Sequence, residues 1–380
     1  MDVTPLMDRL IAGLDPEGDI SNEVKHAMRA VPRHQFVPPI GLVSQKTSAY
    51  LIDRNADPHR WWNTVYSNEP IITQLSDGTT PVTEMDGGYT SSSSSPWTVA
   101  NLLTLLDPDP GNHVLEVGTG TGWTSALLCH LVGRHGEVTS IEVDAAVAEQ
   151  AAKNLAAAGA QPALLIGDGA LGCPDRAPYD RVHVTCGVRS VPHAWVEQCR
   201  AGATIVLPFC PNFGTNHSLR LVVRPDRTAV GRFPGYASYM MMRSQRSSSH
   251  GRTTHPDKHH LTTYVDPRVI AYAPPGAHLA IAALTGLEAN GRDLSDENGE
   301  LYRLWLSDPS DSYSWLALDW RPGSSEYELY QVGDRPLWDE VLNAYFRWVS
   351  WGQPGRERFG MTVSPSGQQI WLDDPDRVVA

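Results

Sequence analysis

Basic residues, cysteines and long apolar runs are all scarce in this sequence. Its 380 residues include 30 lysines and arginines against 43 aspartates and glutamates, which gives a formal net charge of −13 at pH 7. A chain with this balance is poorly suited to binding a phosphate backbone, so we expect no nucleic-acid partner. No run of apolar residues approaches the length of a membrane-spanning helix, so we expect no membrane partner either.

The five cysteines have no spacing that is typical of a metal site or a disulfide framework. We interpret them as reduced thiols and expect no metal in the protein. Four histidines between residues 250 and 260 are interpreted as loop residues rather than ligands. Acidic residues interrupt any apolar run near the N-terminus, so no signal peptide is predicted. These features predict a cytoplasmic protein.

The most informative stretch is residues 113–122, His-Val-Leu-Glu-Val-Gly-Thr-Gly-Thr-Gly. It predicts a strand buried on both faces, then a glycine turn through Gly118, Gly120 and Gly122, then a helix. Glycines at such a turn let a ligand approach the backbone closely. A structural turn in another α/β fold is the alternative interpretation.

The spacing of these glycines differs from the dinucleotide fingerprint, because the third glycine follows the second by two residues rather than three. Glu116 also precedes the glycines, where a carboxylate would repel a pyrophosphate. It would attract a cofactor that carries a cationic amino acid. The stretch therefore favours S-adenosylmethionine over NAD.

Further polar residues follow the next predicted strands of the chain. Glu142 ends a strand at 138–142 and suits the hydroxyls of a ribose, while Asp168 follows a strand near 163–166 and is placed to meet an adenine. Thr185 follows a strand at 179–184. Strands that alternate with helices predict a Rossmann-like, doubly wound α/β fold with its ligands at the carboxyl ends of the strands.

Five consecutive serines, Ser91 to Ser95, precede an apolar helix predicted at 97–106. One interpretation is a flexible linker with a helix cap at its end. The other is a hydroxyl-rich loop over the cofactor, which holds a carboxylate by hydrogen bonds. The position of the run, inside the domain and just before the cofactor strand, favours the second.

With these motifs in order, the chain resembles the protein-L-isoaspartate (D-aspartate) O-methyltransferases. The resemblance covers roughly residues 1–245. It rests on Val-Pro-Arg-His-Gln-Phe-Val-Pro-Pro at 31–39, Ser-Ser-Pro at 94–96, Glu-Val-Gly-Thr-Gly-Thr-Gly at 116–122, Gly-Asp-Gly at 167–169 and Ala-Pro-Tyr-Asp at 177–180.

The resemblance implies the site residues and the cofactor. It implies that Ser94 lies beside the carboxylate that is methylated. The residues implied for S-adenosyl-L-methionine, which leaves as S-adenosyl-L-homocysteine, are Glu116, Gly118, Thr119, Gly120, Gly122, Glu142, Val143, Asp168, Gly169 and Thr185. The residues implied for the substrate are Ser92, Ser93, Ser95, Cys186, Gly187 and Val188.

Three departures from the family pattern indicate a particular branch. Ser92-Ser93 stands where the family usually has Thr-Ile, residues 185–190 are not alanine-rich, and the chain continues well past residue 243, near which the family usually ends. The chain is similar in this to the C-terminally extended branch associated with ribosomally synthesised peptide natural products. That resemblance implies a partner precursor peptide, whose macrocyclised form is methylated on an aspartate and leads to aspartimide or isoaspartate.

Two other functions are weighed against this one. The first is repair of isoaspartate in damaged proteins, with the C-terminal part as a passenger. The second is a peptide-binding or scaffold protein that holds the cofactor without turnover. Glu116, Glu142, Asp168 and Ser94 argue against the scaffold.

Composition divides the chain into three parts. Residues 1–245 are predicted to form the methyltransferase domain with an N-terminal helical extension, 246–262 a polar linker, and 263–380 a second α+β domain that recognises the substrate. Within the second domain we expect strands at 279–284, 301–306, 315–320 and 327–332, a helix at 338–351 and a hairpin at 360–372. Its aromatic residues suit core packing, although an acidic, tryptophan-rich surface would also suit a peptide.

Overall fold

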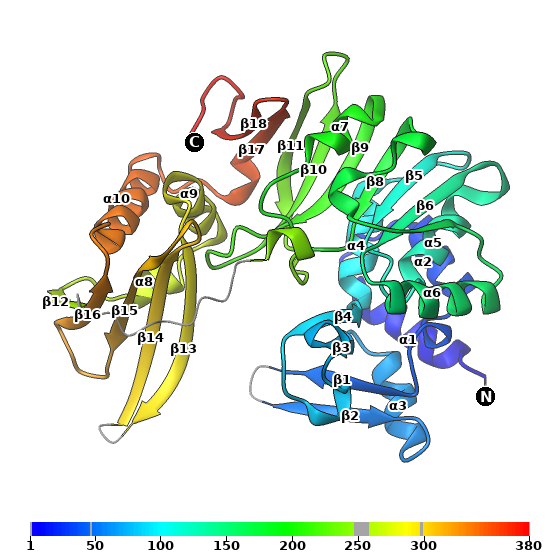
Figure 1. Ribbon diagram of the computed structural model, residues 1–380, viewed down its shortest axis with the longest axis horizontal. Coiled ribbons are helices and arrows are strands. Elements are labelled where there is room, and N and C mark those ends of the chain that lie inside the picture. Colours follow the sequence, from blue (N-terminus) through cyan, green and yellow to red (C-terminus); the bar gives the residue numbers. More distant parts are fainter. Residues whose placement is uncertain (1, 46–47, 247–257, 297–298, 380) are drawn as a thin grey trace.

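The computed structural model describes residues 2–45, 48–246, 258–296 and 299–379. The described chain contains a central nine-stranded sheet, a four-stranded sheet near the N-terminus and a five-stranded sheet in the C-terminal part (Figure 1). Within these ranges, no helix is both long enough and apolar enough to cross a membrane.

The central sheet has the strand order β18-β17-β11-β10-β9-β8-β5-β6-β7. Strands β9, β8, β5, β6 and β7 are parallel, whereas β10, β11, β17 and β18 pair antiparallel. The bounds are β5 His113–Val117, β6 Glu137–Glu142, β7 Ala163–Ile166, β8 Tyr179–Val184, β9 Cys199–Phe209, β10 His217–Val223, β11 Ala229–Gly235, β17 Phe359–Ser364 and β18 Gly367–Leu372. This confirms the expected Rossmann-like α/β fold.

Helices cover both faces of the central sheet, so its parallel strands are apolar along most of their length. Val114 of β5 faces a core built with α2, α4 and α5, whereas the next residue, Leu115, faces a core that includes α7 and α9. The bounds of these and the neighbouring helices are α1 Thr4–Leu14, α2 Asn22–Ala30, α4 Pro96–Leu106, α5 Trp123–Val132, α6 Ala145–Ala157, α7 His193–Glu197 and α9 Pro275–Thr285.

The four-stranded antiparallel sheet has the order β2-β1-β3-β4. In this segment the sequence predicts only a hairpin near Ile71 and Val82; Ile71 does begin β3, but Val82 lies in a 3-10 turn. Its strands are β1 Ile40–Ser44, β2 Ala49–Asp53, β3 Ile71–Leu75 and β4 Tyr89–Ser93, and the helix α3 Pro58–Val65 follows β2. The serine run was expected to be a loop or a linker, but its first three serines lie in β4. They are held there because Ser93 pairs with Ile71 and Ser92 with Ile72 on β3.

The C-terminal sheet is antiparallel, of order β12-β16-β15-β14-β13. Its strands are β12 Lys258–Thr263, β13 Glu288–Asp296, β14 Gly299–Asp308, β15 Asp311–Trp320 and β16 Tyr327–Val332, with the helices α8 Arg268–Ala271 and α10 Leu337–Ser350. The expected strand at 279–284 is wrong, because these residues lie in α9. This alanine-rich segment begins with Pro275 in its first turn and ends at Gly286 in a left-handed conformation, which are signals of a helix.

The last hairpin belongs to the central sheet, since β17 pairs with β11. It therefore joins the sheet of the methyltransferase part, although the sequence analysis placed it in the second domain. Most of the expected linker, residues 247–257, lies outside the described residues, and its end forms part of β12. Two of the four histidines, His250 and His255, lie outside them as well. The described ranges contain no group of side chains suited to holding a metal ion.

Candidate functional site

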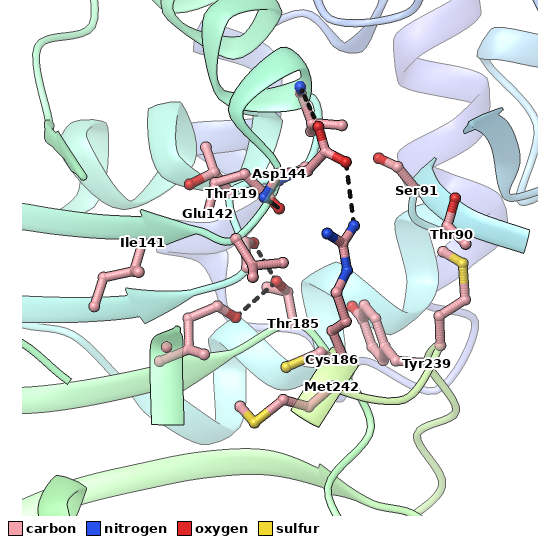
Figure 2. Close-up of a pocket in the computed structure, with 18 of the residues that line it drawn as sticks. Thr90, Ser91, Thr119, Ile141, Glu142, Asp144, Thr185, Cys186, Tyr239 and Met242 are labelled. Carbon is pink, nitrogen blue, oxygen red and sulfur yellow. Dashed lines mark hydrogen bonds and ion pairs between the residues drawn. The ribbon is translucent and has the colours of Figure 1, made fainter. Parts of the chain in front are cut away.

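A cavity of about 350 Å³ lies at the carboxyl ends of the parallel strands (Figure 2). The predicted residues that line it are Ser92, Ser94, Gly118, Thr119, Gly120, Glu142, Val143, Asp168, Gly169, Thr185 and Cys186. The predicted residues that do not line it are Ser93, Ser95, Glu116, Gly122, Gly187 and Val188. We call this the catalytic cavity, and the residues 239–246 that pass along it the strap.

The glycine turn brings backbone rather than side chains to the cavity. Gly118 has φ +96°, and a Cβ there would lie 2.6 Å from Thr185 Oγ1. Gly120 has φ +55°, and its N–H donates to Glu142 Oε2 at 2.9 Å. Both positions require glycine, because other residues rarely adopt this conformation. Gly122 lies away from the cavity and packs against Leu155 instead.

Two carboxylates are fixed beside this turn by backbone N–H groups. Glu142 is almost buried and accepts from Gly120 and, through Oε1, from Asp144 at 3.1 Å. Asp168 caps a short 3-10 helix and accepts from the Ala170 N–H at 2.9 Å. Both acids line the cavity at the ends of neighbouring strands, as the sequence analysis expected.

Glu116 was expected at the cofactor, but its carboxylate lies beneath the glycine turn. It is fully buried, and its Oε2 accepts from Ser140 Oγ at 2.6 Å and from Ser125 Oγ. Its Oε1 has no partner among the described residues. Burial raises the pKa of Glu116 to about 7, against the lowering effect of the two hydroxyls. The Glu116 side chain points into the core beside the sheet, so its carboxylate does not line the cavity.

The serines around β4 divide between the cavity and the protein interior. Ser92 and Ser94 line the cavity. Ser93 is buried, and its Oγ accepts from Arg33 Nε at 3.2 Å. The Ser95 hydroxyl donates to Asn68 Oδ1 at 2.7 Å.

Arg33 holds the backbone that presents Ser94. Its side chain is buried, and Nη2 donates to the carbonyls of Ser93, Ser94 and Glu69 at 3.0, 2.9 and 2.9 Å, while Nη1 donates to that of Val65 at 3.0 Å. Burial lowers the pKa of Arg33 to about 9, so the guanidinium is still charged at neutral pH. The sequence contained Arg33 in its Val-Pro-Arg motif but gave no sign of this role.

The loop after β8 contacts both the cavity and the strap. Thr185 Oγ1 donates to the Val117 carbonyl at 3.0 Å, which fixes the loop against the glycine turn. Gly187 pairs with the strap instead of the cavity: its N–H donates to the Met240 carbonyl at 2.8 Å, and its own carbonyl accepts from Met242 at 2.9 Å. Val188, the next residue of this loop, is fully buried.

The strap supplies a cavity residue that the sequence analysis missed. Tyr239 lines the cavity, and its buried hydroxyl makes no hydrogen bond within the described residues (Figure 2). Burial raises the pKa of Tyr239. The phenol therefore keeps its proton and is available as a donor.

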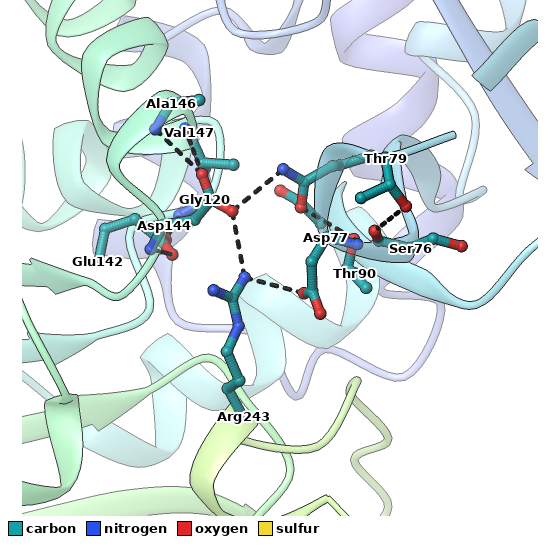
Figure 3. Close-up of polar contacts among 12 residues, drawn as sticks. Ser76, Asp77, Thr79, Thr90, Gly120, Glu142, Asp144, Ala146, Val147 and Arg243 are labelled. Atoms are coloured by element: carbon teal, nitrogen blue, oxygen red, sulfur yellow. Dashed lines mark hydrogen bonds and ion pairs between the residues drawn. The ribbon is translucent and has the colours of Figure 1, made fainter. Parts of the chain in front are cut away.

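Arg243 is the second missed residue, and it joins the strap to Asp144, which lines the cavity, and to Asp77, which follows β3 (Figure 3). Its Nη2 lies 3.1 Å from Asp144 Oδ2 and 2.9 Å from Asp77 Oδ1. Gln74 Nε2 also donates to Asp144 Oδ2 at 3.2 Å, and Arg246 forms a second ion pair with Asp77 at 2.9 Å. These five polar residues connect the four-stranded sheet, the start of α6 and the strap.

Comparisons with known proteins match this chain to one family. The sequence profile of the protein-L-isoaspartate(D-aspartate) O-methyltransferase family matches residues 70–233. Protein-L-isoaspartate O-methyltransferase 1 of Archaeoglobus fulgidus is 33% identical over 196 residues, which are 51% of this chain and 75% of that protein. The protein-L-isoaspartate O-methyltransferase of Methanopyrus kandleri is 36% identical over 204 residues, covering 53% of this chain and 75% of that protein.

One solved structure is similar to nearly the whole chain. It is titled protein-L-isoaspartate O-methyltransferase, and the two share 20% sequence identity with a TM-score of 0.56. The match covers 97% of this chain and 100% of the other. The two proteins therefore share a fold over nearly the whole of this chain, its C-terminal part included.

Proposed function

Because this chain belongs to the protein-L-isoaspartate O-methyltransferase family, we propose that it methylates the carboxylate of isoaspartyl residues in polypeptides. It is an S-adenosylmethionine-dependent carboxyl O-methyltransferase with a Rossmann-like fold. The observation that carries the proposal is one cavity in which the glycine turn, Glu142 and Asp168 lie together with Ser94.

The residues of the cavity fit the cofactor. The turn at Gly118 and Gly120 leaves open space where side chains would otherwise project, and two fixed carboxylates, Glu142 and Asp168, face that space. These residues would hold S-adenosylmethionine, with Glu142 placed for the ribose hydroxyls. When bound, this cofactor supplies an electrophilic methyl group and leaves as S-adenosylhomocysteine.

The task of the protein is to orient the acceptor rather than to activate it. A carboxylate is already ionised at neutral pH, so no general base is needed. The Ser94 hydroxyl and the protonated Tyr239 hydroxyl would hold one carboxylate oxygen, leaving the other directed at the methyl group. Met240–Met242 line the same cavity and would exclude water.

After transfer, the product is a methyl ester on the isoaspartyl residue. The backbone nitrogen of the next residue attacks that ester, methanol leaves, and a succinimide forms. Hydrolysis of the ring returns part of the material to ordinary aspartate, which is the outcome of repair. No side chain of this chain is assigned to the ring-forming step.

The second candidate is methylation of an aspartate in a macrocyclised ribosomal precursor peptide, giving aspartimide or isoaspartate. Its support is the sequence after Thr185, where Cys186 lines the cavity. The other departures support it less. Ser93 stands in the isoleucine position but faces Arg33 rather than the cavity, and the C-terminal extension has a counterpart in a solved structure. We therefore place isoaspartyl methylation first.

The proposed setting is cytoplasmic, with polypeptides as partners. All five cysteines are unpaired in the structure, which supports a reducing compartment.

The experiment that tests the proposal compares three peptides of one sequence, with S-adenosylhomocysteine formation as the readout. The acceptor is L-isoaspartate, L-aspartate in a linear chain, or L-aspartate in a macrocycle. We expect turnover of the isoaspartyl peptide to exceed that of the linear aspartyl peptide by on the order of 100-fold. Turnover of the macrocycle alone would overturn isoaspartyl methylation in favour of methylation of a macrocyclic aspartate. Cofactor binding without turnover of any of the three peptides would overturn both candidates.

A further inference from the structure

A second cavity lies between the C-terminal sheet and the loop that joins β9 to β10. It has a volume of about 470 Å³, and we call it the acidic groove. Three carboxylates line it, from Glu288, Asp308 and Asp311, together with the indoles of Trp305 and Trp315. Among the described residues that line it, none is a lysine or an arginine.

Two of the three carboxylates form ion pairs with arginines outside the groove, and one of these arginines, Arg335, also pairs with Glu340. Glu288 forms an ion pair with Arg189, and Asp308 lies 2.6 Å from Arg335 Nη1. Asp311 is exposed, accepts only the Tyr313 N–H, and has no ion pair within the described part of the chain. One negative charge in the groove is therefore uncompensated.

Three residues that line the groove each have a buried polar atom that lacks a hydrogen-bond partner among the described residues. Ser314 is only 3% exposed, and its Oγ is unpartnered. Asn216 Oδ1 is also unpartnered, although its Nδ2 donates to Ser238 Oγ at 2.9 Å. The third is the donor Nε1 of Trp315. Leaving a buried polar group without a partner is unfavourable, so these atoms indicate a site built for a polar ligand.

We propose that the acidic groove binds a lysine or arginine side chain of the polypeptide substrate. The cation pairs with Asp311 and donates to Asn216 Oδ1 and Ser314 Oγ, while its apolar stem and charge lie against the indoles. The Trp315 N–H requires an acceptor, which neither an ammonium nor a guanidinium offers. A carbonyl of the polypeptide supplies that acceptor, so the ligand is a basic residue within a chain rather than a free polyamine.

The groove and the catalytic cavity are connected along one edge of the central sheet. The loop 210–216 follows the carboxyl end of β9, which is parallel to β8. Its Cys210 N–H donates to the Val188 carbonyl at 2.8 Å, and Arg189, the next residue, pairs with Glu288 of the groove. A polypeptide that runs along this edge reaches the groove with a residue at some distance from the isoaspartate. This inference rests on the proposed function, because the polypeptide in the groove is taken to be the isoaspartyl substrate.

The test uses the full chain and isoaspartyl peptides in which one arginine is moved stepwise along an alanine background. At the favoured position we expect KM about 10-fold lower than for the all-alanine peptide, with kcat unchanged. Asp311→Asn and Ser314→Ala should each remove most of that preference. The matched control is Glu326→Gln, an exposed acid on the turn between β15 and β16 of the same sheet. Equal KM values at every arginine position, or a preference that survives both variants, would overturn the inference.

A binding measurement separates this inference from the proposed function. The same arginine peptide with ordinary aspartate is titrated into the protein by calorimetry, so that no methyl transfer is needed. Binding that is weakened by Asp311→Asn supports the groove even where no peptide is methylated. Methylation without any arginine preference in KM or binding leaves the proposed function intact and overturns only the inference that the acidic groove binds a basic residue.

Discussion

Arg243 of the strap and Asp144 at the start of α6 form an ion pair of 3.1 Å beside the catalytic cavity (Figure 3). Asp144 also caps α6, accepting from the N–H groups of Ala146 and Val147, and lies two residues after Glu142. The pair therefore connects the strap to the strand end that is proposed to hold the ribose. Loss of the arginine should loosen the strap while leaving the glycine turn intact.

For Arg243→Gln we expect the Kd for S-adenosylhomocysteine to rise about 5-fold, which corresponds to roughly 1 kcal/mol for a partly exposed ion pair. Calorimetric titration measures this directly. Arg268→Gln is the matched control, since its ion pair with Asp266 lies in the C-terminal part. A Kd that is unchanged in Arg243→Gln would mean that the strap does not contribute to holding the cofactor.

Tyr239→Phe removes one unpartnered hydroxyl from the catalytic cavity and keeps the ring that packs there. If this hydroxyl orients the acceptor carboxylate, kcat/KM for the isoaspartyl peptide should fall about 10-fold, the equivalent of one hydrogen bond to a charged group. Affinity for S-adenosylhomocysteine should stay the same. The control is Tyr236→Phe, an exposed tyrosine three residues earlier. Equal kcat/KM values for the two variants would mean that the Tyr239 hydroxyl does not orient the acceptor carboxylate.

The parts of the site that the sequence predicted depend on local signals. Gly118 and Gly120 follow β5, Glu142 is the last residue of β6, and Asp168 follows β7. Parallel strands bring their carboxyl ends to one edge, so sequence order alone places these residues together. The position of Ser94 was given by the family resemblance instead.

The parts that the sequence did not predict depend on distant pairing. Tyr239 and Arg243 reach the cavity because Met241 pairs with Gly187, more than fifty residues earlier, and no periodicity marks that contact. Glu116 was misjudged for a related reason: side-chain direction alternates along a strand, and the sequence does not say which face meets the ligand. The strand expected at 279–284 failed because a short apolar run fits a buried helix equally well.

Glu116 should make the protein less stable as pH rises through the weakly acidic range. Its folded pKa of about 7 lies above the value of 4.5 expected when exposed, so the folded state binds the extra proton between these limits. The contribution of Glu116 to the free energy of unfolding is fully present below about pH 4.5 and is lost as pH rises through 7. This contribution is about 3 kcal/mol at most. Fully buried His183 acts in the opposite sense, because burial lowers its pKa to about 3 and charging it on acidification favours unfolding.

Glu116→Gln keeps an acceptor for Ser125 and Ser140 but cannot ionise. We expect the Tm of Glu116→Gln, measured relative to that of the parent protein, to increase as pH rises from 5 to 8. The contribution of His183 is the same in both proteins. Glu137→Gln, an exposed acid at the start of β6, should show no such trend in calorimetry. A Tm difference that is constant across this range would show that Glu116 is ionised throughout in the folded protein.

The last prediction concerns the hairpin β17–β18, which is far from the methyltransferase part in sequence but paired to it in space. Phe359, Met361 and Val363 are buried in the core that also contains Leu219 and Leu221. Removing three buried side chains of this size costs more than about 5 kcal/mol, a large share of the 5–15 kcal/mol that stabilises a typical domain. A chain ending at residue 358 should therefore aggregate or lose its cooperative thermal transition.

The hairpin also holds the loop beside the cavity, because Gln368 accepts from the Val191 N–H and donates to the Arg189 carbonyl, both at 2.9 Å. The truncated chain should accordingly fail to bind S-adenosylhomocysteine. A chain ending at residue 372 is the control, since it keeps both strands and loses only the final segment. If the chain ending at 358 instead unfolds cooperatively and binds the product normally, the edge of β11 tolerates exposure.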